Sequence, residues 1–192
     1  VLDGISNQST NEDTAKSITL VGTDAESNSL TYSAISSSSD VTASVSGNTL
    51  TLTPASNWSG TVTITAKVND GSSDSTAQTF TLTVSAVNDI PTMNTPNNLI
   101  TAVNTAKTLT LSGSDVEGSS LTYSATSSNS SQVATSISGT TLTLTPASNW
   151  SGTATITVKS NDGTVDSSNK TFTITVGANT SLLVVRIAFS NA

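Results

Sequence analysis

The chain has 192 residues, of which 34% are hydrophobic and only 10% are charged, and its formal net charge is −7. Abundant Thr, Val and Ile with sparse charge favour folded β-structure over disorder. The acidic balance, with scattered Lys and Arg, excludes nucleic acid and anionic membranes as expected partners. The absence of Cys and His excludes disulfides, zinc sites and thiolate or imidazole catalysis.

An internal repeat organises the sequence. Residues 49–61 read TLTLTPASNWSGT and residues 141–153 read the same, while 23–34 closely match 114–125. Each copy has about 90 residues, close to the size of a sandwich domain that folds alone. The repeat predicts four segments: a first domain at 1–87, a linker at 88–91, a second domain at 92–178 and a tail at 179–192.

Within each copy the apolar residues alternate with polar ones. Val62, Ile64, Ala66 and Val68 share one face of a segment whose other face is Thr and Lys. This period of two predicts strands with one buried face, and no segment has a helical period. Turn signals such as Asp70-Gly71 separate the strands. The expected strands of copy one are 1–6, 16–22, 30–35, 41–46, 49–53, 61–69 and 77–85. The fold class is therefore all-β, with two tandem seven-stranded Greek-key sandwiches.

Trp58 and Trp150 occupy identical places before the sixth strand of each copy. A Trp ring can stack on a sugar, or it can fill the open corner of a sandwich. Their position between apolar strands favours the second interpretation. Tyr32 and Tyr123 lie in phase with core leucines and are expected to pack in the core.

The C-terminal tail has no counterpart in copy one. It is the most apolar segment of the chain, but its eight to ten apolar residues are too few to span a membrane as a helix, and no other apolar segment is long enough. Three interpretations remain open: it adds to a sheet edge of its own domain, it inserts into a neighbouring subunit as a donated strand and builds a filament, or it begins a further domain. We expect a C-terminal apolar strand whose interaction residues are Leu182, Leu183, Val184, Val185, Ile187 and Phe189.

The ordered set NEDTA (11–15), LTYS, TLTPASNWSGT, VNDG, TFTLTV and AVNDIP (86–91) resembles the bacterial cadherin-like and immunoglobulin-like tandem repeats of large surface adhesins. The resemblance covers roughly residues 1–178. In that family such repeats mostly build extended stalks, and many bind calcium at domain junctions. Some cadherin-like modules accompany polysaccharide-degrading enzymes and bind carbohydrate.

The resemblance implies a calcium site where the linker meets the second copy, because calcium prefers carboxylate and amide oxygens. The implied ligands are Asn88, Asp89, Asp115, Glu117 and Asp162. The weaker copy-one equivalents are Asp24, Glu26 and Asp70. The alternative is that these residues form Asx turns and solvated loop carboxylates. The preceding domain has NWSG where a cadherin has an acidic pair, so the resemblance implies at most one ion at the junction.

These observations predict an extracellular structural or adhesive surface protein. It would be a rigid stalk segment, or a fibre subunit that self-associates through its C-terminal strand, with a surface glycan or cell receptor as a further possible partner. We expect no enzyme, because Asp24 and Glu26 are neighbouring loop carboxylates without an aromatic cleft. The alternative is a carbohydrate-binding module of a secreted polysaccharide-active protein, which would need an exposed aromatic strip.

Overall fold

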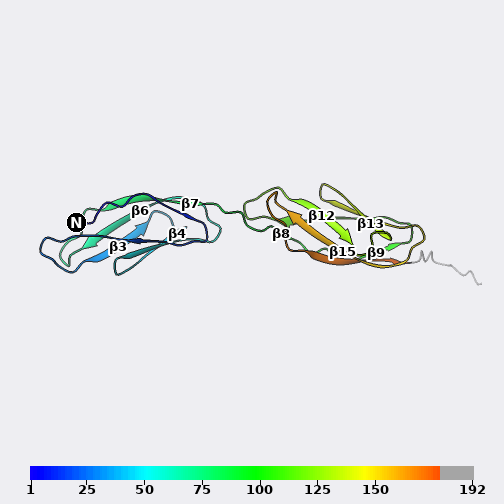
Figure 1. Cartoon of the computed structure of the whole chain (residues 1–192), viewed down its shortest axis with the longest axis horizontal. Helices are drawn as coiled ribbons and strands as arrows, with labels where there is room; N and C mark the ends of the chain where they lie inside the picture. Colours follow the sequence, from blue (N-terminus) through cyan, green and yellow to red (C-terminus); the bar gives the residue numbers. More distant parts are fainter. Residues whose placement is uncertain (178–192) are drawn as a thin grey trace, which may run out of the picture. The chain divides into compact units, whose positions relative to one another are not determined.

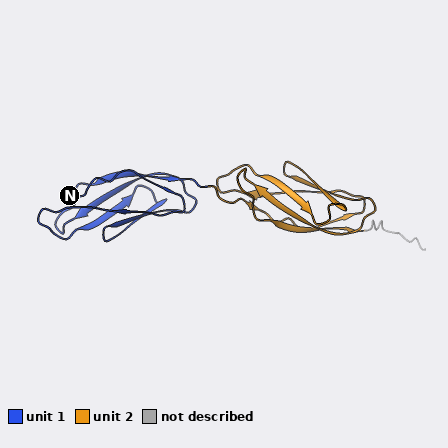
Figure 2. Cartoon of the chain, viewed as in Figure 1, with its two compact units in different colours: residues 1–87 blue, residues 88–192 orange. Residues whose placement is uncertain are grey.

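The computed structural model describes residues 1–177. The chain divides into two compact units, Val1–Val87 and Asn88–Ala192, shown in separate colours in Figure 2. Every regular element within residues 1–177 is a β-strand, so the all-β prediction is confirmed. No helix in this part of the chain is long and apolar enough to cross a membrane.

Unit 1 is a sandwich of a four-stranded and a three-stranded sheet (Figure 1). The larger sheet has the order β1-β7-β6-β3, with β1 at Gln8–Asn11, β7 at Gln78–Ser85, β6 at Gly60–Asn69 and β3 at Thr31–Ser36. The smaller sheet has the order β2-β5-β4, with β2 at Lys16–Thr19, β5 at Thr49–Pro54 and β4 at Val41–Ser46.

Unit 2 repeats this arrangement and adds a short strand pair. Its four-stranded sheet has the order β12-β15-β16-β9, with β12 at Thr122–Ser127, β15 at Gly152–Asn161, β16 at Lys170–Gly177 and β9 at Leu99–Ala102. Its three-stranded sheet has the order β10-β14-β13, with β10 at Lys107–Thr110, β14 at Thr141–Pro146 and β13 at Val133–Ser138. The pair joins β8 (Thr92–Met93) to β11 (Gly113–Ser114).

Each unit has its own hydrophobic core, which the alternating sequence pattern explains. In unit 1, Val62 and Ile64 of β6 and Leu82 of β7 are buried between the sheets. The Thr residues that alternate with them pair across the outer face, as in Thr61 with Thr83. Each fully buried aliphatic side chain contributes roughly 1.5–3 kcal/mol, so these strands supply much of the stability of unit 1.

The strand predicted at residues 1–6 is wrong. In this segment only Leu2 forms a β-bridge, to Gly22, while the strand itself lies at Gln8–Asn11 and pairs with β7. The chain crosses from one sheet to the other at this point. The buried Leu2 gave the apolar signal on which the prediction depended. Gln8–Asn11 is polar and is held by backbone pairing at the sheet edge, so its sequence has no apolar alternation that would predict a strand.

The tryptophans fill the corners of the sandwiches. Trp58 is partly buried against the core of unit 1, and Trp150 against that of unit 2. A Cβ atom added to Gly60 or Gly152 would lie 2.7 Å from the Cζ2 atom of the respective Trp ring. Each ring therefore packs directly on a glycine, and the core-packing interpretation is confirmed.

Ser160 on β15 tests the packing of the core of unit 2, because it is buried (0% exposed) and its hydroxyl has no hydrogen-bond partner within residues 1–177. The matching residue in unit 1 is Val68, which is also buried. We expect Ser160→Val to raise the free energy of unfolding of unit 2 by about 1 kcal/mol, because it removes an unsatisfied hydroxyl and adds buried apolar surface. Chemical denaturation measures the change, and the reciprocal Val68→Ser should destabilise unit 1. A destabilised Ser160→Val variant would contradict this account.

Candidate functional site

The predicted acidic residues meet at one end of unit 2. Asn88 and Asp89 begin the unit, and Asp162 directly follows β15. The Asn88 side chain donates a hydrogen bond from Nδ2 to Oδ2 of Asp162 at 2.9 Å. The backbone N–H of Asp89 donates to Oε2 of Glu117 at 3.1 Å. The two residues that precede the body of unit 2 are therefore fastened to two of its loops.

Asp115 lies in the loop after β11 and has one oxygen committed to that loop. Its Oδ1 accepts a hydrogen bond from the N–H of Ser119 at 2.9 Å. Its Oδ2 is buried and accepts no hydrogen bond within residues 1–177. A buried carboxylate oxygen without a partner is costly, so this atom is suited to a cation or a water molecule.

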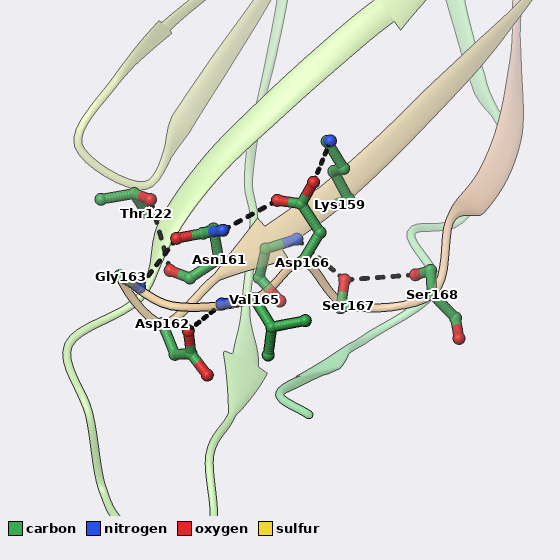
Figure 3. Close-up of polar contacts among 10 residues, drawn as sticks. Thr122, Lys159, Asn161, Asp162, Gly163, Val165, Asp166, Ser167 and Ser168 are labelled. Atoms are coloured by element: carbon green, nitrogen blue, oxygen red, sulfur yellow. Dashed lines mark hydrogen bonds and ion pairs between the residues drawn. The ribbon is translucent and has the colours of Figure 1, made fainter. Parts of the chain in front are cut away.

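Asp162 is held by its own turn, as Figure 3 shows. Its Oδ1 accepts hydrogen bonds from the N–H groups of Thr164 (2.6 Å) and Val165 (2.7 Å). The N–H of Val165, and then the amide of Asn88, lower the pKa of Asp162 below its usual value. Asp162 is therefore ionised at neutral pH and is part of an Asx turn.

A second group of polar side chains shapes the same loop (Figure 3). Asn161 accepts from the N–H of Gly163 at 2.7 Å and donates to Asp166 at 2.9 Å. Asp166 also pairs with Lys159. Lys159, and then Asn161, lower the pKa of Asp166. Sequence reasoning missed this network, although its spacing, Lys-x-Asn-Asp-Gly-x-x-Asp, occurs in both copies.

The predicted calcium ligands do not form one cluster of carboxylates. Within the described residues, no three acidic side chains lie close enough together to hold a metal ion. The structure instead joins Asn88 to Asp162 and Asp89 to Glu117, with Asp115 bonded within its own loop. The oxygen ligands match what calcium prefers, but the loops already use several of these oxygens for hydrogen bonds.

In each unit, a strand near the start of the unit pairs with the last described strand, which is a feature that the sequence did not predict. β1 pairs in parallel with β7, from Gln8 opposite Leu82 to Asn11 opposite Ser85. In unit 2, β9 pairs in parallel with β16 in the same way. The other described strand pairs of these two sheets are antiparallel. We call the two parallel pairs the terminal-strand pairs.

Side chains extend the terminal-strand pairs beyond the strands. In unit 1, Oδ1 of Asn7 accepts from the N–H of Thr81 at 2.9 Å. At the other end, Oε1 of the buried Glu12 accepts from the N–H of Val87 at 2.5 Å. In unit 2, Oδ1 of Asn98 accepts from the N–H of Thr173 at 2.8 Å. The Asn bond is thus repeated in both units, directly before the earlier strand of each terminal-strand pair.

The family described as "Bacterial Ig domain" matches this chain twice, at residues 2–83 and 88–175. The chain belongs to the bacterial Ig domain family. Each unit is therefore one Ig domain, and the tandem immunoglobulin-like and cadherin-like resemblance inferred from the motifs is confirmed.

Solved structures with the same fold include cadherin fragments. The EC1-2 fragment of human protocadherin-24 has a TM-score of 0.58 at 16% identity, covering 84% of this chain and 88% of that chain. The EC22-24 fragment of mouse cadherin-23 has a TM-score of 0.53 at 20% identity, covering 93% of this chain and 64% of that chain. At these identities the similarity shows a shared fold. No sequence among the curated proteins matches this chain.

In the first Ig domain the equivalent acidic residues are used by their own loops. Oδ1 of Asp24 accepts from the N–H groups of Glu26 (3.1 Å) and Asn28 (2.9 Å). The N–H groups of Ser73 and then Ser72 lower the pKa of Asp70. Asp24 and Asp70 line a cavity of about 170 Å³.

The exposed large apolar side chains of residues 1–177 are all aliphatic: Val1, Val21, Ile35, Val87, Ile90, Ile100 and Val116. The described part of the two Ig domains therefore has no exposed aromatic strip of the kind that a carbohydrate-binding module needs. The predicted interaction residues Leu182, Leu183, Val184, Val185, Ile187 and Phe189 lie outside the described residues.

The loop aspartates predict how stability depends on pH. The pKa values of Asp70, Asp74, Asp162 and Asp166 are lowered in the folded protein, so the unfolded state binds protons more readily. Their stabilising contribution is present above the unfolded value of about 4 and is lost as the pH falls through the folded values. Urea denaturation between about pH 6 and pH 2.5 should show stability falling on acidification. Asp166→Asn should reduce this slope for the second Ig domain alone, and an unchanged slope would contradict the assignment.

Proposed function

We propose that this chain is a load-bearing segment of an extracellular bacterial surface protein, in which two Ig domains transmit force along a stalk or fibre. The observation that carries the proposal is the terminal-strand pair of each domain. Membership of the bacterial Ig domain family and the tandem repeat support a structural role.

The terminal-strand pairs suit a domain that is pulled from its two ends. The chain enters the first domain before β1 and leaves it after β7, and these strands run parallel. Pulling the ends apart drives the two strands past each other, so the hydrogen bonds between them are loaded together. An antiparallel hairpin pulled at its open end would lose its bonds one after another. The parallel arrangement therefore supports mechanical resistance.

The connection between the domains also supports this function. Val87 is the last residue of the first unit, and its N–H is held by Glu12. Asn88 is the first residue of the second unit, and its side chain is held by Asp162. Because consecutive residues are fastened to their own domains, we propose that force passes between the domains without a slack linker.

A calcium ion at the acidic end of the second domain is the next part of the proposal. The buried Oδ2 of Asp115 is its best-supported ligand atom, with Asn88, Asp89, Glu117 and Asp162 completing the set. A bound ion would supply positive charge that cross-links these loops. The hydrogen bonds of Asn88 and Asp89 already hold residues 88–89 against the loops after β11 and β15. On binding the ion, Glu117 and Asp162 would exchange these hydrogen bonds for metal contacts.

Calcium binding should stabilise the second Ig domain selectively. Extracellular modules bind calcium with dissociation constants of about 0.1–1 mM, so about 10 mM calcium should raise the melting temperature of this domain. Asp115→Asn should remove both the heat of binding in titration calorimetry and this shift, while Asp24→Asn in the first domain should leave both unchanged. No binding heat from the unmodified chain would contradict the calcium proposal and leave the mechanical one intact.

Self-association through residues 182–189 is the last part of the proposal. It is supported by the sequence, in which these residues form the most apolar segment. Several chains joined in this way would build a fibre of Ig domains.

Single-molecule force spectroscopy tests the mechanical function. Pulling the full chain from its ends should give two unfolding events, each lengthening the chain by about 250–300 Å. Asn98→Ala should lower the rupture force of the second domain and Asn7→Ala that of the first, because each removes a side-chain bond of one terminal-strand pair. Thr135→Ala, which removes a hydrogen bond elsewhere, is the control. Equal effects of Asn98→Ala and the control on rupture force would overturn the proposal.

A further inference from the structure

We propose that the β3–β4 edge of the first Ig domain binds the apolar segment Leu182–Phe189 of a second copy of this chain as an added strand. The inference rests on the self-association proposed above and names the surface that receives the segment. It follows from differences between two domains that otherwise match closely.

β3 is an outermost strand of the four-stranded sheet, and β4 is an outermost strand of the three-stranded sheet. The N–H of Ser37 donates to the C=O of Thr63 at 2.9 Å, which fixes the ladder between β3 and β6. Because antiparallel ladders alternate, the backbone groups of Ala34 and Ser36 point away from β6. An edge with outward N–H and C=O groups can pair with another strand.

In the second domain the corresponding edge is closed by a side chain. The hydroxyl of Thr135 on β13 donates to the C=O of Ala125 on β12 at 3.1 Å. The matching residues in the first domain are Ala43 and Ala34, and alanine has no hydroxyl to donate. The C=O of Ala34 therefore lacks the bond that occupies this edge in the second domain.

Two further differences make the first-domain edge a better acceptor. Ile35 is 68% exposed, whereas the second domain has Thr126 at this position. Asp40 lies in the loop between β3 and β4, where the second domain has the neutral Gln132. Between β3 and β4 lies an open groove of about 510 Å³, lined by residues 34–39 and 41–43. The edge thus combines the exposed Ile35 and outward backbone groups with Asp40 in the adjoining loop, whose carboxylate accepts a hydrogen bond from Ser38.

The segment 182–189 has the matching chemistry. It contains no Pro or Gly, and Leu183, Val185, Ile187 and Phe189 alternate along it, which gives one apolar face in an extended strand. Its single charged residue, Arg186, complements Asp40. Eight extended residues span about 26 Å, enough to cover the six residues of β3.

The occupant is assigned to a second copy because the self-association proposed above joins separate chains through this segment. In the second domain, which carries the segment, the corresponding edge is closed by the bond from Thr135 to Ala125. The open edge of the first domain in another molecule is therefore the acceptor, and an intramolecular contact would leave the chain monomeric.

Sedimentation of the full chain tests the proposal with substitutions that copy the second domain. The double variant Ile35→Thr and Ala43→Thr should raise the dissociation constant of the self-associated chains about tenfold or more, which corresponds to about 1.4 kcal/mol. Asp40→Gln alone should raise this dissociation constant by a smaller factor, and that factor should be larger at low salt than at high salt. The control places conservative changes, Thr126→Ser and Thr135→Ser, on the second-domain edge and should have no effect.

The outcomes separate the two levels of the proposal. Deleting residues 181–192 should abolish association, and if it does not, or if the unmodified chain stays monomeric, the proposed self-association fails together with this inference. If the deletion abolishes association but the first-domain variants do not weaken it, only the β3–β4 acceptor is overturned.

A direct readout uses the absence of cysteine from the chain. A benzophenone attached through Ile35→Cys should cross-link to a peptide within residues 181–192 of another molecule, as mass spectrometry of isotopically mixed chains would show. The same probe attached through Thr126→Cys should not. Equal cross-linking from the two positions would overturn the assignment.

Discussion

The parallel pairing of an early strand with the last described strand is the constraint on which each domain depends. It adds the edge strand of the larger sheet by joining residues more than 70 positions apart, such as Gln8 and Leu82. In the first domain it also places the entry and exit of the chain on neighbouring strands, and Asn7 and Glu12 strengthen the pair at its two ends. The cores formed by alternating Val, Ile and Leu hold the sheets together, while this pair determines how the domain responds to force at its ends.

The acidic end of the second domain shows how one set of residues can stabilise loops and still offer ligands. Asp162 is held by backbone N–H groups and by Asn88, which explains its lowered pKa without a metal. Asp115 differs, because one of its oxygens is buried and accepts no hydrogen bond from the described residues. The Asx-turn interpretation thus accounts for Asp162, whereas Asp115 is the reason to propose an ion.

The sequence predicted those features that depend on periodicity and repetition. Alternation on β6 and β7 identified the core strands, and the identical Trp58 and Trp150 indicated corner packing. It failed for Gln8–Asn11, because a polar strand held at a sheet edge by backbone bonds has no apolar alternation. The hydrogen bonds of Asn7, Asn98 and Glu12 were also missed, since these residues contact partners about 75 positions away, which a local pattern does not reveal. The acidic residues were located by resemblance, while their division into hydrogen-bonded pairs required the fold.

The two domains differ at one edge: Thr135 bonds to Ala125 there in the second domain, whereas the first domain has Ala43 at that position, with Ile35 and Asp40 nearby. The central claim is that the terminal-strand pairs carry load, and the direction of pulling tests it most directly. The first domain can be pulled from its ends, or across the β4–β5 hairpin through cysteines introduced at Ser39 and Ala55. The account predicts a clearly higher rupture force from the ends, where the parallel strands are sheared, than across the hairpin, where bonds open singly. Equal forces in the two directions would contradict it.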